Sequence, residues 1–208
     1  DVAAAIATFG ETVVELLLGN GDGTLQPTIQ LTELRNPGNL AAADFNRDGH
    51  LDLVYTESLT PSQNTRSNTL TVALGRGDGT FQTPISTAIP FTVHNIYAAD
   101  MDGDAVPDMI LASASFPTTT LNFLRGVGDG TFAAPIPFFF VAPGFSRALA
   151  IDDFDGDGKR DVAYLDRTHL NILRGNGNGT IESLLQIAAP NSSSVAAGDF
   201  DRDGRPDL

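Results

Sequence analysis

The sequence predicts an all-β fold, a β-propeller made of four blade-type repeats with four antiparallel strands each. Two short phrases, one acidic and one rich in glycine, alternate along the 208 residues, and β-prone runs lie between them. The acidic phrases begin at residues 44, 100, 153 and 199, a period typical of stacked units that cannot bury their faces alone. No segment has a convincing 3.6-residue apolar period, so we expect little helix.

Each acidic phrase places oxygen-bearing side chains at positions 1, 3, 5 and 9 of a nine-residue loop. The predicted ligands are Asp44, Asn46, Asp48 and Asp52; Asp100, Asp102, Asp104 and Asp108; Asp153, Asp155, Asp157 and Asp161; and Asp199, Asp201, Asp203 and Asp207. Carboxylates this close repel one another unless a cation lies among them, and an all-oxygen ligand set favours Ca²⁺ over transition metals. The sequence therefore predicts about four calcium ions, one in each acidic loop.

Two other interpretations of the acidic phrases are weaker. A surface turn rich in Asp and Gly would explain one such phrase, but not four in register. An EF-hand loop begins in the same way and requires a bidentate Glu at position 12. That position is Tyr55, Leu111 or Tyr164 in the first three phrases, so the EF-hand interpretation fails.

The glycine-rich phrases predict hairpin turns. They occupy residues 18–25, 74–81, 126–132 and 175–181, and each contains Asp-Gly or Asn-Gly between apolar runs. Both residues tolerate a positive φ, which tight hairpin turns require. A phosphate cradle is disfavoured, because no helix follows whose N-terminus would receive an anion.

The two phrases also predict the strand order. In the second repeat the β-prone runs are Leu53–Glu57, Leu70–Leu74, Phe81–Ile89 and Val93–Ala98. An acidic loop then joins the first strand of a blade to the second, and a glycine turn joins the third to the fourth, so both lie at one face. The irregular segments expected at the opposite face are 58–68, 90–95, 114–120, 143–147, 166–168 and 190–193.

The phase of the repeat bears on domain organisation. Asp1 corresponds to position 9 of an acidic loop, so the chain opens at the second strand of a blade. An expected first strand at 192–198 would either close a four-bladed ring beside the N-terminal strand or belong to a larger propeller. We expect residues 1–208 to form a single propeller domain.

The charge of the chain is explained by its acidic loops. The net charge is −14, and 15 of the 26 acidic residues stand at predicted ligand positions. Four calcium ions would bring the total to about −6, an ordinary value for a soluble domain. The acidity argues against nucleic acid or an anionic membrane surface as partner, and no apolar run approaches the ~20 residues that span a bilayer.

The aromatic side chains are expected mainly in packing roles, and the sequence contains no familiar catalytic motif. Phe45, Phe154 and Phe200 follow the first predicted ligand of their loops and are expected to pack between blades. The run 138–140 contains three phenylalanines and forms either a buried strand or an exposed binding patch. The histidines His50, His94 and His169 have no zinc-type spacing partner, and no nucleophile, Walker or dinucleotide motif occurs, so we do not expect an enzyme.

The phrase Leu-Gly-Arg-Gly-Asp-Gly-Thr-Phe at 74–81, followed by Ala-Asp-Met-Asp-Gly-Asp at 99–104, resembles the FG-GAP or VCBS-type repeat. The family is similar to the calcium-loop blades of integrin α-subunits and to some propeller lectins. The resemblance implies a β-propeller whose calcium ions bind side chains at positions 1, 3, 5 and 9 and the backbone carbonyl at position 7. Those carbonyl donors would be His50, Val106, Lys159 and Arg205.

Two loops depart from the pattern of the family. Ala105 replaces glycine at position 6 of the second loop, which implies a strained or weaker site if that residue needs a positive φ. Asn46 lowers the charge of the first loop.

The expected function is that of a calcium-stabilised, non-catalytic recognition, adhesion or structural assembly module, secreted or at the cell surface. Its protein or glycan ligand is expected on the face opposite the calcium loops. One alternative is a carbohydrate-binding lectin, with candidate contacts Tyr55, Tyr97, Tyr164 and His94. Another is an accessory propeller of a polysaccharide-degrading enzyme. The oligomeric state is left open.

Overall fold

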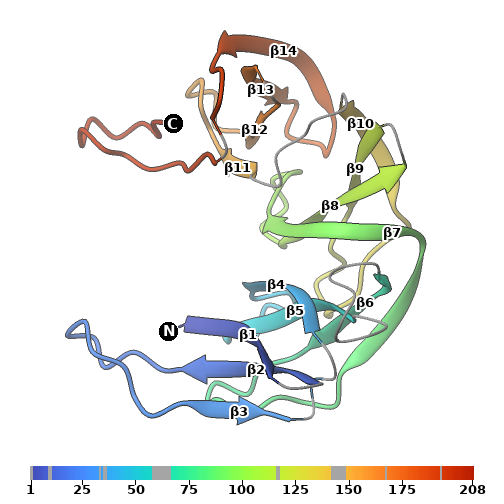
Figure 1. Ribbon diagram of the computed structural model, residues 1–208, viewed down its shortest axis with the longest axis vertical. Helices are drawn as coiled ribbons and strands as arrows, with labels where there is room; N and C mark the ends of the chain where they lie inside the picture. Colours follow the sequence, from blue (N-terminus) through green and yellow to red (C-terminus); the bar gives the residue numbers. More distant parts are fainter. Residues whose placement is uncertain are drawn as a thin grey trace. The chain divides into compact units, whose positions relative to one another are not determined.

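The computed structural model of the protein describes residues 2–8, 11–32, 34, 37–57, 67–115, 118–141, 149–166, 168–192 and 194–208. These residues contain fourteen strands and no helix, hence no helix that could cross a membrane (Figure 1). The strands are β1 (Val2–Thr8), β2 (Glu11–Leu17), β3 (Ile29–Leu31), β4 (Pro37–Ala43), β5 (Asp52–Glu57), β6 (Ser67–Ala73), β7 (Ile85–Ala99), β8 (Asp108–Ser115), β9 (Thr118–Leu124), β10 (Ile136–Val141), β11 (Leu149–Asp152), β12 (Asp161–Leu165), β13 (His169–Gly175) and β14 (Ile181–Ala188).

The strands form antiparallel blades in which neighbours in sequence are neighbours in the sheet. Blade 1 has the order β1-β2-β3, and blade 4 has the order β11-β12-β13-β14. Blade 2 consists of β4, β5, β6 and the first part of β7, and blade 3 of the last part of β7 with β8, β9 and β10. Blade 1 begins at its second strand, as the phase of the repeat predicts, and the all-β, blade-type fold is confirmed.

The chain divides into two compact units, each with its own core. The first is Asp1–Ile96 with Val127–Thr131, and the second is Tyr97–Gly126 with Phe132–Leu208. Buried side chains of blades 1 and 2 form the core of the first unit: Val14, Leu16, Leu31, Leu34, Leu53, Tyr55 and Ala73. Blades 3 and 4 supply the core of the second: Met101, Ile110, Ala112, Leu121, Phe123, Leu149, Val162, Tyr164 and Leu173.

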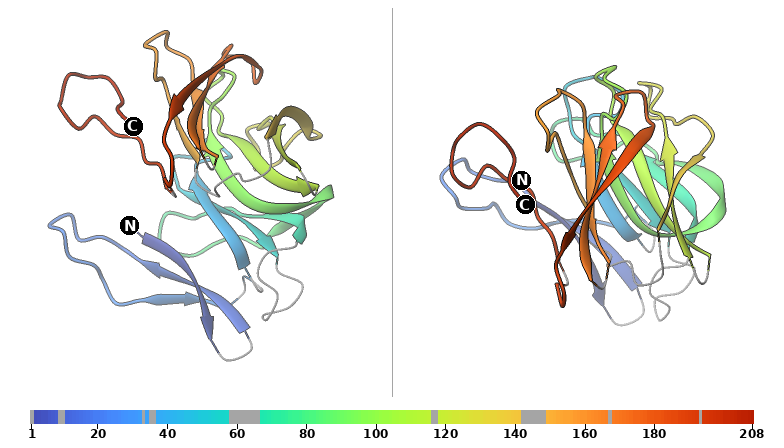
Figure 2. Two further views of the ribbon diagram at one scale, coloured as in Figure 1. Left: turned by 45° about the horizontal axis from the view of Figure 1, so that its top comes forward. Right: turned by 90° about the horizontal axis from the view of Figure 1, so that it is seen from above.

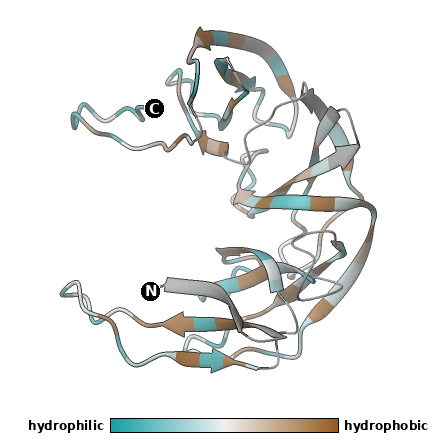
Figure 3. Ribbon diagram, viewed as in Figure 1, coloured by the Kyte–Doolittle hydropathy of each residue, from teal (hydrophilic) through white to brown (hydrophobic). Residues whose placement is uncertain are grey.

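β7 is longer than the sequence predicts. Residues 90–95 are expected to be an irregular connection, but they continue a single strand in which apolar and polar bands alternate (Figure 3). The pairing with β6 shifts between Thr69↔Ala88 and Ser67↔Val93, so an irregularity in the ladder falls around Pro90. Proline has no N–H to donate and is tolerated in strands where pairing is interrupted.

The expected strand at 192–198 is wrong. After β14 the described residues 194–197 have no strand structure, and a single bridge joins Gly198 to Asp207 (Figure 2). The predicted irregular segment 58–68 lies mostly outside the described residues, as does 143–147. Irregular structure over 114–120 is wrong for the described residues, since 114–115 belong to β8 and 118–120 to β9. The prediction of one single domain over 1–208 stays a prediction.

Candidate metal centres in the acidic loops

The acidic loops of blades 2, 3 and 4 each close a hairpin between the first and second strands of the blade, and the last acidic loop is closed by the bridge from Gly198 to Asp207. Asp52 pairs with Ala43 across β4 and β5, and Asp161 pairs with Asp152 across β11 and β12, so positions 1 to 8 form the loop itself. The loops of blades 2, 3 and 4 are 44–52, 100–108 and 153–161, and the last loop is 199–207. Their side chains organise the backbone in the same way in all four.

The aspartate at position 1 accepts hydrogen bonds from the backbone that curls around it. One of its carboxylate oxygens accepts the N–H of position 6 at 2.8 to 3.0 Å in each loop. The other oxygen accepts from position 4 or 5, for example from Gly103 to Asp100 at 2.7 Å and from Asp203 to Asp199 at 3.1 Å. These bonds fold the loop around the first carboxylate.

Positions 3 and 5 each use one oxygen for the loop and leave the other. At position 3 the Oδ1 atom accepts the N–H of position 5, as in Asp102 from Asp104 at 3.2 Å. At position 5 the Oδ1 atom accepts the N–H of position 7, as in Asp157 from Lys159 at 2.9 Å. The same two bonds occur in the other loops. The Oδ2 atoms of the aspartates at positions 3 and 5 therefore take no part in this backbone network, whereas Asn46 at position 3 of the first loop has an amide nitrogen in place of Oδ2.

This curled backbone requires a positive φ at positions 4 and 6. Position 6 has φ of 85° or 86° at its three glycines and 62° at Ala105. Ala105 therefore has the positive φ that strains the backbone of the second loop. Position 4 has φ of 78° at Gly103 and Gly156 and 60° and 65° at Arg47 and Arg202. A positive φ at position 4 is not evident from the sequence, because two of the four residues at this position are arginine.

Position 9 has a second role that the sequence analysis missed. Asp52, Asp108 and Asp161 are buried, and each accepts two backbone hydrogen bonds with its two oxygens. One comes from position 2 of its own loop, such as Phe45 to Asp52 at 2.8 Å; the other comes from the first glycine of the turn in the same blade, such as Gly75 to Asp52 at 2.8 Å. Equivalent pairs of backbone N–H groups donate to Asp108 and Asp161. Position 9 thus joins the acidic loop to the glycine turn.

The first residue of each of these turns must be glycine because the backbone of the acidic loop lies close to its Cα atom, not because it has a positive φ. A Cβ atom on Gly75, Gly126 or Gly175 would lie 2.2, 2.4 or 2.0 Å from the carbonyl oxygen at position 8 of the acidic loop. No side chain fits there. A glycine at the end of the third strand or two residues beyond it is the sequence signal that could have revealed this contact. The contact confirms that loop and turn of one blade lie side by side.

Burial sets the protonation of position 9. Desolvation raises the pKa of Asp52, Asp108 and Asp161, and nearby loop carboxylates add to this, while the two N–H donors act in the opposite direction. The pKa of Asp108 is raised to about 6. In the absence of a cation, burial and the neighbouring carboxylates therefore disfavour the charged form of these three aspartates.

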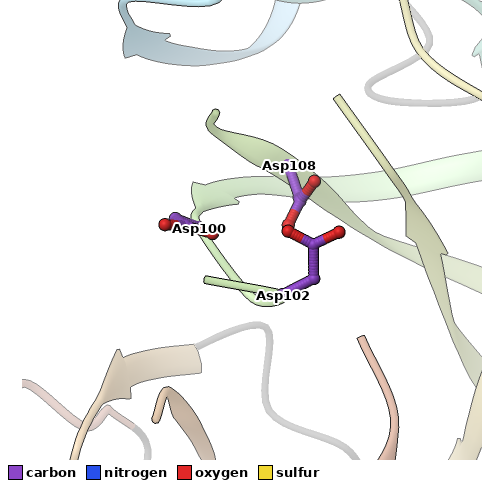
Figure 4. A group of neighbouring side chains, drawn as sticks. All are labelled: Asp100, Asp102 and Asp108. Atoms are coloured by element: carbon purple, nitrogen blue, oxygen red, sulfur yellow. The ribbon is translucent and has the colours of Figure 1, made fainter. Parts of the chain in front are cut away.

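The structure brings carboxylate oxygens together in three of the loops. Within each group one oxygen of every member lies within 4.8 Å of the others; the groups are Asp100, Asp102 and Asp108 (Figure 4), Asp153, Asp155 and Asp161, and Asp199, Asp201 and Asp203. Such clusters could hold a metal ion, and their all-oxygen donor set suits a hard cation such as Ca²⁺. Asp104, Asp157 and Asp207 are not members of these groups, and ligation by individual residues, including the carbonyls at position 7, stays a prediction.

The glycine turns use their acidic residues differently. The Oδ1 atom of Asp22 accepts both the backbone N–H of Thr24 at 2.9 Å and its hydroxyl at 2.6 Å. The same pair of bonds occurs at Asp78, Asp129 and Asn178. The threonine hydroxyl and N–H hold the pKa of the three aspartates below its usual range. These aspartates stabilise their own turn.

Turns also contact the loop of the preceding blade through the backbone. Gly130 N–H donates to the carbonyl of Phe45 at 3.2 Å, and Gly179 N–H donates to that of Met101 at 3.2 Å. Phe45 is 1% exposed. Phe200, expected to pack between blades, is 73% exposed, so that expectation is wrong for this residue.

The candidate lectin contacts are mostly core residues. Tyr55 and Tyr164 are buried in the cores of the first and second units, and Tyr97 is half-buried against the second core. Phe138 is half-buried with its ring edge-on to Phe123 at 6.5 Å, which favours packing over a binding patch. The side chains of residues 139 and 140 lie outside the described residues.

A cavity of about 730 Å³ lies in the second unit, beside the acidic loops of blades 3 and 4. Its lining includes Asp100, Asp153, Lys159, Arg160 and Asn176. The volume is within the range of small-ligand sites. From the sequence, the ligand is expected on the opposite face. The cavity is not evident in the sequence, because residues that line it, such as Ala98 and Lys159, lie far apart along the chain.

Comparison with known proteins agrees with the repeat structure. The model of the FG-GAP-like repeat matches residues 1–55, 62–111 and 153–208. Cartilage acidic protein 1 of Xenopus tropicalis is 27% identical over 160 residues, which cover 71% of this chain and 24% of that protein. A lectin of Agrocybe aegerita that recognises non-reducing terminal N-acetylglucosamine shares the fold with a TM-score of 0.58 at 17% identity, over 86% of this chain and 48% of the lectin. The chain thus spans about a quarter of the one and half of the other, and it belongs to the FG-GAP-like repeat family.

Proposed function

We propose that the protein is a calcium-stabilised, non-catalytic recognition module that works outside the cell. The observation that carries the proposal is the shared geometry of the four acidic loops. Backbone N–H groups bind one oxygen at positions 3 and 5 and leave the other, and like charges that gather within 4.8 Å favour a cation among them.

Calcium would be held by the side chains at positions 1, 3 and 5, with position 9 and the carbonyl at position 7 as further donors, and it would cross-link each loop. Suppose that each site had a Kd near ~10 μM and free Ca²⁺ were about 1 mM. Each ion would then stabilise the fold by about 2.7 kcal/mol. Millimolar calcium is typical outside cells, and this supports the extracellular assignment.

Isothermal titration of the chelator-treated protein tests the proposal directly. We expect four calcium ions per chain, with Mg²⁺ binding more weakly because its small octahedral shell fits a curled nine-residue loop poorly. A protein that takes up no calcium at millimolar concentration would contradict the proposal.

A glycan is the more specific ligand that one observation favours. The cavity beside the loops of blades 3 and 4 is lined by carboxylate, amide and cationic groups that suit a hydroxyl-rich ligand, and a lectin shares the fold. A protein ligand on the opposite face is the other candidate. A glycan array in calcium, followed by pull-down of surface proteins, separates the two.

The structure offers a matched pair of variants for this test. Asn176 lines the cavity, and its amide donates to Thr180 at 2.8 Å; Asn20 of blade 1 makes the same bond to Thr24 at 2.9 Å and does not line the cavity. Asn176→Ala should weaken glycan binding, whereas Asn20→Ala should not. Equal effects of the two substitutions, or a silent array, would remove the glycan candidate and leave the protein ligand.

A further inference from the structure

Two arginines lie across the acidic loops of their own blades. Arg125 directly precedes the first glycine of the turn in blade 3. Its Nε lies 2.9 Å from Oδ2 of Asp102, and its Nη2 lies 3.0 Å from Oδ2 of Asp104. These are the oxygens at positions 3 and 5 that the loop backbone leaves. One guanidinium therefore bridges oxygens at two of the predicted ligand positions.

Blade 4 repeats this arrangement. Arg174 directly precedes the first glycine of its turn, and its Nε is bonded to Oδ2 of Asp155. Its Nη2 lies 3.7 Å from Oδ2 of Asp157, to which Lys159 Nζ is also close at 3.2 Å. The two arginines occupy equivalent positions and contact equivalent atoms.

Blade 2 lacks both partners of this ion pair, the arginine before the turn and the aspartate at position 3. Leu74 stands where the arginines stand, and position 3 is Asn46 instead of aspartate. The amide of Asn46 donates to Oδ2 of Asp48 at 2.8 Å, so a neutral donor takes the place of the guanidinium. Four ligand carboxylates with one arginine in blades 3 and 4, and three ligand carboxylates without one in blade 2, give the same sum of −3 when only these groups are counted.

We propose that Arg125 and Arg174 are built-in counter-cations of the acidic loops in blades 3 and 4, and that they lower the calcium affinity of these loops. This inference rests on the proposed function, because calcium is the ion with which they compete. Without metal, each guanidinium relieves the repulsion between positions 3 and 5. With metal, it must give up or share those oxygens.

The exposure of the partners makes this exchange feasible. The side chain of Arg125 is 57% exposed, whereas that of Asp102 is 14% exposed. The guanidinium is readily hydrated on release, while the carboxylate stays in the loop. An exposed ion pair of this kind is weak enough for a divalent ion to displace.

The test reads each loop separately in one molecule. Backbone amide signals of Gly49, Ala105 and Gly158 report on the loops of blades 2, 3 and 4 by NMR during calcium titration. Arg125→Leu installs the residue that blade 2 has, and we expect about fivefold tighter calcium binding at Ala105 with no change at Gly49 or Gly158. Arg174→Leu should shift only Gly158. Arg76→Leu, an exposed arginine in the turn of blade 2, is the control and should change none.

A metal-free measurement distinguishes this proposal from the proposed function. In EGTA, Arg125→Leu should lower Tm, and adding Asp102→Asn should recover part of the loss. Unchanged or weaker calcium binding at Ala105 would overturn the affinity role, and an unchanged Tm in EGTA would overturn the counter-cation role. If the unaltered protein bound no calcium at all, the proposed function and the affinity role would fail together, while the result in EGTA would still decide the counter-cation role.

Discussion

The acidic loops and the glycine turns have similar compositions, yet their carboxylates are used in opposite ways. In a turn, Asp129 bonds the N–H and hydroxyl of a threonine two residues away, and its pKa is lowered by those bonds. In a loop, Asp108 is buried among other carboxylates and its pKa is raised. The turn satisfies its charge locally, whereas the loop leaves charge that an ion can satisfy.

This difference shows why counting acidic residues does not locate a metal site. What separates the two motifs is crowding and burial: Asp129 of a turn is exposed and engaged by one threonine, whereas Asp108 of a loop is buried beside other carboxylates. Five predictions test the comparison, from the largest expected effect to the smallest.

Removal of calcium should have the largest effect. With four sites at the assumed affinity, chelation removes about 11 kcal/mol, so Tm should fall by about 20 °C or more in excess EGTA. Thermal unfolding followed by circular dichroism measures this. An unchanged melting curve would show that the loops need no ion and differ little from the turns.

Loss of the buried aspartate should affect stability more than loss of a turn aspartate. Asp108→Ala leaves the N–H groups of Met101 and Gly126 without their acceptor, and we expect a loss of about 3 kcal/mol in the free energy of unfolding. Asp129→Ala in the turn of the same blade should cost much less, since water reaches its donors. Urea unfolding of both variants is the measurement, and equal losses would contradict the distinction.

Calcium stoichiometry should distinguish loop from turn directly. Asp157→Ala should reduce the number of bound ions by one, because its Oδ2 lies outside the backbone network of the loop. Asp22→Ala should leave the number at four, because its carboxylate is engaged by Thr24. Isothermal titration counts the ions, and a lost ion in the second variant would make the turns ligands as well.

The stability of the calcium-free protein should depend on pH through Asp108. Its pKa is raised to about 6 in the folded state against about 3.9 in an unfolded chain, so folding favours the protonated form. This contribution is fully present below about pH 4 and is lost as pH rises through 6. Urea unfolding in EGTA should therefore show a rise in stability from pH 7 to pH 5, and Asp108→Asn should flatten that part of the curve.

Relief of backbone strain should give the smallest effect. Ala105 has φ of 62° where the other loops have glycine, and a left-handed alanine is disfavoured by about 1 kcal/mol. Ala105→Gly should thus stabilise the protein by up to about 1 kcal/mol. The matched substitution Gly158→Ala should destabilise blade 4 by a similar amount, and opposite signs would show that φ is not the reason.

The repeat, the strand order and the proximity of loop and turn could be predicted because each depends on short-range patterns. Asp-Gly and Asn-Gly turns and oxygen donors at fixed spacing are local properties of the chain. The double role of Asp52 could not be predicted in this way, since Gly75 lies 23 residues further along and the bond exists only after β5 and β6 have paired.

Other features could not be predicted for the same reason, because they depend on contacts between segments that are distant in sequence. The sequence treats Pro90 as a strand breaker, but the irregular pairing of β6 and β7 accommodates it. Arg125 and Arg174 lie beyond the boundaries of the glycine phrases in sequence, and only the folded blade brings them to positions 3 and 5 of the loops. Phe200 follows its acidic loop pattern, yet burial depends on a neighbouring turn rather than on its own phrase.

The hydrogen bonds from Gly130 to Phe45 and from Gly179 to Met101 involve main-chain atoms alone. These two contacts between successive blades therefore do not depend on the side chains of Phe45 and Met101, although the shared cores still require side chains that fit. A blade that keeps its loop and its turn keeps this part of the joint when it is duplicated or exchanged. Such a chain can diversify its outer surface in evolution while its means of assembly stays the same.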